Sequence, residues 1–145
     1  MVNEIRAVFE ELGGEQAVGR LLSSDRDLRE AIREGFRPAV VEKLMRVSGL
    51  TLKELASAVD LSPRSLQRRR RNGRLARYES DRVYRLARII ALANEFLGDH
   101  ARAMRWLRRP NPALGNLAPL AAIDTEPGAR QVENILGRIA YGGIS

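Results

Sequence analysis

The stretch that decides the fold is residues 51–73, which read TLKELASAVDLSPRSLQRRRRNG. Thr51 and Glu54 have the Thr-x-x-Glu spacing of a capping box, which predicts a helix that begins just after Thr51. Ser62 is a favoured N-cap residue and Pro63 suits the first position of a second helix, which the final Asn-Gly ends. Two capped helices joined by a three-residue turn form the helix-turn-helix pattern.

The interior and the turn of this motif are also specified by residue type. Its apolar wedge is expected to consist of Leu55, Val59, Leu61 and Leu66. Ala56 is small, so the second helix can approach the first closely. Asp60 occupies the turn position where such motifs often carry Gly. A left-handed backbone there would cost a non-Gly residue roughly 1–2 kcal/mol, and less for Asp, whose side chain can bond locally.

The outward side of the second helix is polar and basic, which favours contacts with phosphates or base edges of duplex DNA. The residues expected to bind DNA are Ser62, Arg64, Ser65, Gln67, Arg68, Arg69, Arg71 and Arg74. Among the arginines, Arg69, Arg70 and Arg74 are expected to contact the DNA backbone or to lie over the edge of the core. The alternative is a motif used only for packing, with the arginines as a solvated face. Four consecutive arginines argue against that alternative, because a solvated helix gains little from stacking like charges.

The positive charge of the chain is concentrated around this motif. The 145 residues carry a net charge of +7, and residues 38–77 alone hold 10 Lys and Arg against 3 acids. The flanking segments are much closer to neutral: net −2 over 1–37, +3 over 78–109 and −1 over 110–145. A local basic patch of this kind indicates a polyanionic partner.

Composition also excludes several classes of protein. Without Cys the chain can form neither disulfides nor a thiolate zinc site. The single His, His100, is expected at the surface in the first turn of a helix. No nucleophile or acid–base constellation and no phosphate-binding glycine loop appear, so neither an enzyme nor a cofactor or metal is expected. The longest apolar run, 89–93, is far short of the ~20 residues that span a bilayer, and the start of the chain lacks an apolar signal core. Few aromatic residues accompany the basic ones, which argues against a membrane-surface protein. We therefore expect a soluble cytoplasmic protein that touches no membrane.

Helical spacing of apolar residues predicts an all-α fold with no strands. The expected helices cover about 5–12, a short segment up to 22, 25–34 after a serine cap, 38–48, the two motif helices, 78–97, 99–109 and a last one capped by Thr125. A loop rich in Pro, Gly and Asn is expected from Pro110 to Pro119. We divide the chain into an N-terminal helical region over 1–77, with the helix-turn-helix at about 38–73, and a small helical domain over 78–145.

The chain resembles the Xre/MbcA/ParS-type antitoxins, and specifically the antitoxins of RES–Xre toxin–antitoxin pairs. The stretches that carry the resemblance are Leu12-Gly13-Gly14, Leu55-Ala56, Ser62–Arg69, Gly73-Arg74-Leu75, Glu79–Arg82, Arg85–Arg88, Trp106–Asn111, Leu114-Gly115, Pro119-Leu120, Thr125 with Gly128, and Arg138–Gly142. They run in order over nearly the whole chain. The Trp-Leu-x-x-Pro-Asn segment followed by Leu-Gly and Pro-Leu is the most specific of them.

This resemblance implies a dimeric, all-helical antitoxin that binds operator DNA, represses its own operon and covers the active site of a RES-domain toxin, an enzyme that consumes NAD⁺. The toxin-binding residues it implies are Trp106, Leu107, Pro110, Asn111, Leu114, Gly115, Tyr141, Gly142, Gly143, Ile144 and Ser145. The apolar tail from Tyr141 also has the composition of a terminus that docks on something. The alternative is a stand-alone helix-turn-helix regulator whose C-terminal domain senses a small molecule.

Overall fold

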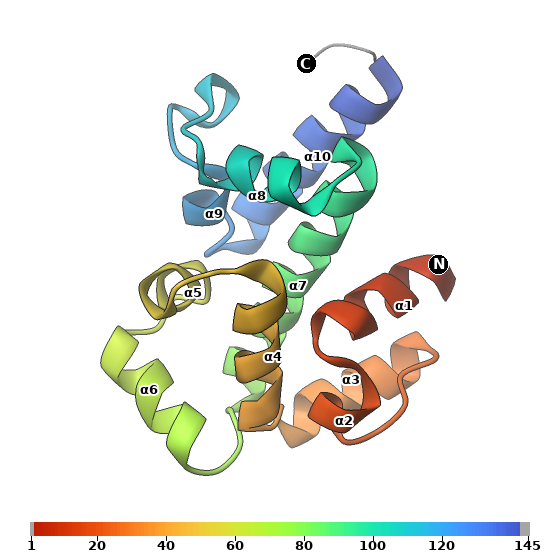
Figure 1. Cartoon of the computed structure of the whole chain (residues 1–145), viewed down its shortest axis with the longest axis vertical. Helices are drawn as coiled ribbons and strands as arrows, with labels where there is room; N and C mark the ends of the chain where they lie inside the picture. Colours follow the sequence, from red (N-terminus) through yellow and green to blue (C-terminus); the bar gives the residue numbers. More distant parts are fainter. Residues whose placement is uncertain (1, 143–145) are drawn as a thin grey trace.

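The computed structural model describes residues 2–142, which form ten α-helices and one short 3-10 turn (Figure 1). The helices are α1 (Val2–Glu11), α2 (Gly14–Val18), α3 (Asp25–Glu34), α4 (Pro38–Ser48), α5 (Leu52–Ala58), α6 (Pro63–Arg71), α7 (Arg77–Leu97), α8 (His100–Arg108), α9 (Pro119–Ala122) and α10 (Glu126–Gly142), with the turn η1 (Pro112–Leu114) before α9. In this part of the chain, β-type pairing is limited to one bridge between Asn111 and Leu117. The predicted all-α class is confirmed.

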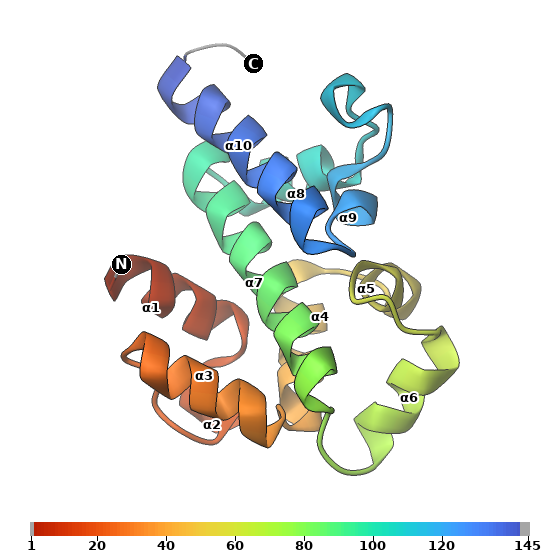
Figure 2. The same ribbon diagram turned by 180° about the vertical axis from the view of Figure 1, so that it is seen from behind.

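The long helix α7 forms the axis of the molecule. Its side chains at Leu86, Ile89, Ile90 and Ala93 are completely buried. Helices α1, α3 and α4 of the N-terminal region pack on α7, and so do α8 and α10 of the C-terminal region (Figures 1 and 2). No helix among residues 2–142 is both long and apolar enough to cross a bilayer. Because α7 belongs to the packing of both halves, the two parts of the chain share one core, and the division after residue 77 stays a prediction.

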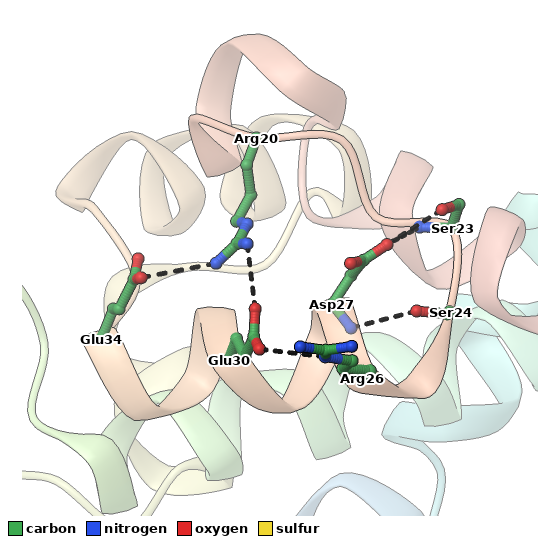
Figure 3. Close-up of polar contacts among 7 residues, drawn as sticks. All are labelled: Arg20, Ser23, Ser24, Arg26, Asp27, Glu30 and Glu34. Atoms are coloured by element: carbon green, nitrogen blue, oxygen red, sulfur yellow. Dashed lines mark hydrogen bonds and ion pairs between the residues drawn. The ribbon is translucent and has the colours of Figure 1, made fainter.

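Helix α3 begins with the predicted serine cap. The hydroxyl of Ser24 accepts a hydrogen bond from the backbone N–H of Asp27 at 3.2 Å, and the backbone N–H of Ser23 donates to the Asp27 carboxylate at 3.0 Å. Hydrogen bonds from the backbone and hydroxyl of Ser23 lower the pKa of Asp27. Figure 3 shows how Arg20, which follows α2, reaches across to Glu30 at 3.2 Å. Local capping and the ion pairs from Arg20 to Glu30 and Glu34 therefore hold α3 against the segment that follows α2.

The placement of His100 differs from the expected surface position. The ring is half-buried, with Nδ1 3.0 Å from the side-chain oxygen of Asn94 and Nε2 3.3 Å from the carbonyl oxygen of Ser48. Asn94 in turn donates to the buried carboxylate of Glu11 at 2.9 Å. Burial raises the pKa of Glu11. The prediction failed because the end of α4, which is distant in sequence, packs over the start of α8.

Helix α10 is held on α7 by two arginines. Arg88 pairs with Glu133 at 2.5 Å and with Glu126 at 3.2 Å, and Arg85 donates to the carbonyl of Ile123 at 3.3 Å. The hydroxyl of Thr125 accepts from the N–H of Gly128 at 3.2 Å, which confirms the predicted cap. The sequence did not predict the one-turn helix α9, although a proline stands at its first position as in longer helices.

Candidate nucleic-acid interface and C-terminal surface

The helix-turn-helix forms with the predicted caps. The hydroxyl of Thr51 accepts from the N–H of Glu54 at 3.1 Å, and the Glu54 carboxylate accepts from the N–H of Thr51 at 3.0 Å. Ser62 caps α6 by accepting from the N–H of Ser65 at 3.0 Å. Leu55 and Leu66 are fully buried between the helices. These caps satisfy N–H groups that the first turn of a helix leaves without partners, so the two helices begin at defined residues.

The turn between α5 and α6 adopts the backbone that its sequence disfavours. Asp60 has φ +55°, so this non-glycine residue is in the left-handed region. The next residue, Leu61, donates its N–H to the carbonyl of Ala56 at 2.8 Å. Arg82 of α7 approaches the Asp60 carboxylate at 3.9 Å. Asp is among the residues that tolerate this conformation best, and the turn retains the geometry of the motif.

Three arginines in and after α6 face the rest of the protein. Arg69 donates to the buried carboxylate of Glu79 at 2.9 Å. Arg70 forms two bonds to Glu42 of α4, at 2.6 and 3.0 Å. The hydrogen bonds from Arg70 lower the pKa of Glu42 and raise that of Arg70. Arg69 and Arg70 thereby fix α6 on α7 and α4. Arg74, in the segment after α6, donates to the carbonyl of Gly35 at the end of α3 at 3.0 Å.

The remaining polar side chains of α6 face away from the protein. Arg64, Arg68 and Arg71 are exposed and form no ion pair with any residue that the structure describes. Ser62 is also exposed, whereas Ser65 and Gln67 are half-buried and Gln67 accepts from Arg70 at 2.9 Å. This surface, which we call the outer face of α6, offers three arginines for phosphates or guanine edges. It lies at the opposite end of the molecule from α8 and α10 (Figures 1 and 2).

The segment after α8 forms a compact loop. The side chain of Asn111 accepts from the N–H of Ala113 at 2.9 Å, and its backbone N–H donates to the carbonyl of Leu117 at 2.9 Å. Gly115 has φ +66°, a backbone that favours glycine. Leu114 is buried beneath the loop, as is Leu107 at the end of α8. The internal bonds and the apolar anchors give this loop one defined shape.

Trp106 and Tyr141 lie on the outside of this C-terminal part. Trp106 is half-buried against the core, and Pro110 beyond the end of α8 is exposed. Tyr141 is 85% exposed, although its ring meets that of Phe96 edge-on at 6.1 Å. The predicted site residue Gly142 ends α10 and is exposed, while Gly143, Ile144 and Ser145 lie outside the described residues. No three carboxylate or imidazole groups gather as metal ligands would anywhere in the described part of the chain.

An ion pair joins α5 to α8, and the sequence did not indicate it. Arg108 of α8 donates to both carboxylate oxygens of Glu54, at 2.7 and 3.2 Å, and to the carbonyl of Gly49 at 3.0 Å. Glu54 thus serves the cap of α5 and binds the C-terminal part at the same time. No local spacing signals a contact between residues so far apart in sequence.

This bridge predicts a pH dependence of stability. The hydrogen bonds from Arg108 lower the pKa of Glu54 from its usual 4.5, so the ionised carboxylate adds stability that is fully present above about pH 4.5 and lost as the pH falls through the folded-state value. Because both side chains are about a third exposed, the loss is expected to stay below about 1 kcal/mol. In Glu54→Gln, which retains the cap, the melting temperature is expected to fall less steeply between pH 5 and pH 3 than in the unaltered chain. Glu95→Gln is the exposed control, and equal slopes in all three proteins would contradict the assignment.

Comparison with known proteins gives the class of this chain. A profile described as the antitoxin Xre-like helix-turn-helix domain matches residues 27–88, and one described as the antitoxin Xre/MbcA/ParS C-terminal toxin-binding domain matches residues 92–142. A protein named Antitoxin Xre from Yersinia enterocolitica is 31% identical over 142 residues, which is 97% of this chain and 92% of that protein. Proteins of the same name from Photorhabdus laumondii and Pseudomonas putida are 33% and 35% identical, over 90% and 83% of this chain and 89% and 76% of their own lengths.

The chain belongs to the Xre/MbcA/ParS antitoxin family. It is a type II antitoxin with a helix-turn-helix domain and a C-terminal toxin-binding domain, and it is not an enzyme. This confirms the resemblance to the Xre/MbcA/ParS-type antitoxins, whereas the RES toxin as partner stays a prediction. The helix-turn-helix predicted at about 38–73 falls inside the matched region, and the predicted C-terminal residues up to Gly142 fall inside the toxin-binding domain or at its end.

Proposed function

We propose that this antitoxin binds and neutralises a RES-domain toxin that consumes NAD⁺, by covering the entrance to its active site, and that it represses its own operon by binding operator DNA. The observation that supports this pair of roles is the separation of two surfaces. The outer face of α6 carries three arginines without intramolecular partners among residues 2–142, and the toxin-binding domain lies at the other end of α7. The choice of a RES toxin rests on the resemblance of the Trp106–Asn111 segment, and of the stretches after it, to antitoxins of RES–Xre pairs.

In this proposal, the outer face of α6 reads the operator. Arg64 and Arg68 contact bases, and Arg71 contacts a phosphate. Ser62, Ser65 and Gln67 contribute hydrogen bonds at the start of the helix. Arg69 and Arg74 act as positioning residues, since their guanidinium groups already bind Glu79 and the carbonyl of Gly35.

The toxin contacts of the proposal lie on the C-terminal surface. Trp106, Pro110, Asn111 and Gly115 lie on the outside of the compact loop or beside it, whereas Leu107 and Leu114 hold its shape from the interior. The tail from Tyr141 to Ser145 reaches toward the toxin's active site. Chemistry in the complex belongs to the toxin, because the antitoxin acts by occupying a surface.

The protein is further proposed to act in the cytoplasm as a homodimer. One helix-turn-helix rarely buries enough surface for tight operator binding, and a two-fold dimer matches paired half-sites about one helical turn apart. Light scattering of the purified antitoxin and footprinting on its own promoter test this point. A monomer that protects a single half-site would contradict it.

Co-expression tests the main proposal. The product of the neighbouring reading frame is expected to arrest growth and deplete cellular NAD⁺ when expressed alone, and the antitoxin is expected to reverse both effects. Growth arrest with unchanged NAD⁺ would replace the RES toxin with a toxin of another activity. A neighbouring product without toxicity would instead favour the stand-alone regulator, and the ligand of its C-terminal domain would then be sought.

Deletion of the tail separates the two roles. Removing residues 141–145 is expected to weaken toxin neutralisation by about tenfold or more, because the exposed Tyr141 ring and the residues after it are proposed to contact the toxin. Operator affinity is expected to stay within about twofold, because the outer face of α6 lies at the other end of the molecule. Neutralisation is followed by residual NAD⁺ consumption, and DNA binding by fluorescence anisotropy. Loss of operator binding with intact neutralisation would reverse the assignment of the two ends.

A further inference from the structure

Two apolar hollows flank the Trp106 ring. One, of about 440 Å³, lies between the loop after α8 and the last turns of α10, and includes Ile135 and Pro112. The other, of about 400 Å³, lies between the end of α7 and α8, and includes Phe96. Trp106 and Ile139 border both hollows, so the two are adjacent, and we call them together the Trp106 groove.

The rim of the Trp106 groove is positive. Arg102, Arg105 and Arg109 border one hollow and Arg138 the other, and no acidic residue lines either. All four arginines are exposed and form no ion pair with any residue in the described part of the chain. Nearby Arg88 and Arg108, by contrast, are each paired with glutamates. None of the four rim arginines is among the candidate site residues predicted from the sequence.

Four positive charges around an apolar floor are energetically unfavourable in an isolated protein. Their mutual repulsion is relieved when a partner brings carboxylates to the rim, and the floor leaves water only when an apolar side chain fills it. A nucleic acid would neutralise the rim, but its phosphates would leave the apolar hollows unfilled. A protein segment that carries both apolar and acidic side chains matches the whole groove.

We infer that the Trp106 groove receives a segment of the toxin in which one or more apolar side chains are flanked by Asp or Glu. This inference rests on the proposed function, since it takes the toxin as the partner of the C-terminal domain. It adds the chemistry of the contact: the hollows beside Trp106 hold the apolar anchor, and Arg105 and Arg138 on the two sides of the groove pair with the flanking carboxylates. Electrostatic attraction at the rim accelerates association and makes it sensitive to salt.

The test uses the full-length antitoxin and the purified toxin of the same operon. Trp106 is the single tryptophan of the chain, so 5-fluorotryptophan labelling places one ¹⁹F probe in the groove. Toxin binding is expected to shift this resonance. The double variant R105E/R138E is expected to bind toxin about tenfold or more weakly by calorimetry, with a reduced salt dependence. The matched control is R130E on α10, an exposed arginine that borders neither hollow, and it is expected to bind as the unaltered chain does.

The outcomes separate this inference from the function on which it rests. If the unaltered antitoxin does not bind the toxin, the proposed function fails. If it binds, and R105E/R138E binds equally well with the same melting temperature, the inference alone fails. Loss of dimerisation or of operator binding in R105E/R138E would also overturn it, by assigning the groove to a second copy or to DNA. Replacing the toxin carboxylates that pair with Arg105 and Arg138 by arginine is expected to restore the binding of R105E/R138E.

Discussion

Replacing Arg64 or Arg68 with alanine is expected to weaken operator binding by about 1–3 kcal/mol, roughly a 5- to 150-fold loss, where the arginine reads a guanine through two hydrogen bonds. Both side chains are exposed on the outer face of α6 and form no ion pair within residues 2–142. Their removal therefore leaves the fold intact, and the whole effect appears in the affinity. Fluorescence anisotropy with the operator and with a scrambled duplex measures both affinities.

The comparison of the two duplexes assigns each arginine. A loss confined to the operator indicates base reading, and an equal loss on both duplexes reassigns the residue to a phosphate. Each phosphate contact is expected to add roughly −0.9 to the slope of log affinity against log salt. An affinity that does not depend on salt would exclude this surface as the DNA-binding face. Arg130→Ala, far from α6, is the surface control.

Replacing Gly128 with alanine is expected to destabilise the protein by about 3 kcal/mol. A Cβ atom at this position would stand 1.7 Å from the carbonyl oxygen of Ala122, and this backbone atom at the end of α9 has little freedom to move away. The close approach is needed because the first turn of α10 packs directly on the end of α9. Urea unfolding monitored by circular dichroism measures the free energy of unfolding.

The same helix contains a matched control. A Cβ atom at Gly137 would meet no other atom within 4 Å, so Gly137→Ala is expected to stabilise α10 by about 0.5–1 kcal/mol through its higher helix propensity. We therefore expect Gly128→Ala to lower the free energy of unfolding and Gly137→Ala to raise it. A Gly128→Ala variant as stable as the unaltered chain would show that α9 can shift to make room. Toxin neutralisation, measured where Gly128→Ala is still folded, is expected to suffer more than operator binding.

The helix-turn-helix could be predicted from the sequence because its signals are local. Thr51 with Glu54, and Ser62 with Pro63, specify two helix starts through hydrogen bonds and backbone angles that span at most three residues. The family motifs around Trp106 led in the same way to the toxin-binding domain. Short helices were harder to predict from the sequence, because a single turn such as α9 leaves almost no periodic pattern of apolar residues.

Spacing alone set Arg69 and Arg70 apart from the outward arginines but left open whether they contact DNA or lie over the edge of the core. Residues 68–71 are four identical side chains in a row, yet Arg70 binds Glu42 and Arg69 binds Glu79, while Arg68 and Arg71 stay exposed. Helix periodicity indicates which of them face inward, but their partners lie on α4 and α7. Local chemistry identified the basic helix, and the tertiary packing decided which of its charges remain for a ligand.

The sequence by itself determined the helical class, the positions of the caps, the helix-turn-helix and the family, because each of these is encoded in neighbouring residues or in ordered motifs. The tertiary structure decided the contacts between distant segments: the bridge from Arg108 to Glu54, the half-buried His100 and the groove beside Trp106 with its arginine rim. The physical reason is that a capping bond or an apolar stripe depends on spacing within one helix. An ion pair or a hollow between helices depends on how α7 brings α4, α8 and α10 together.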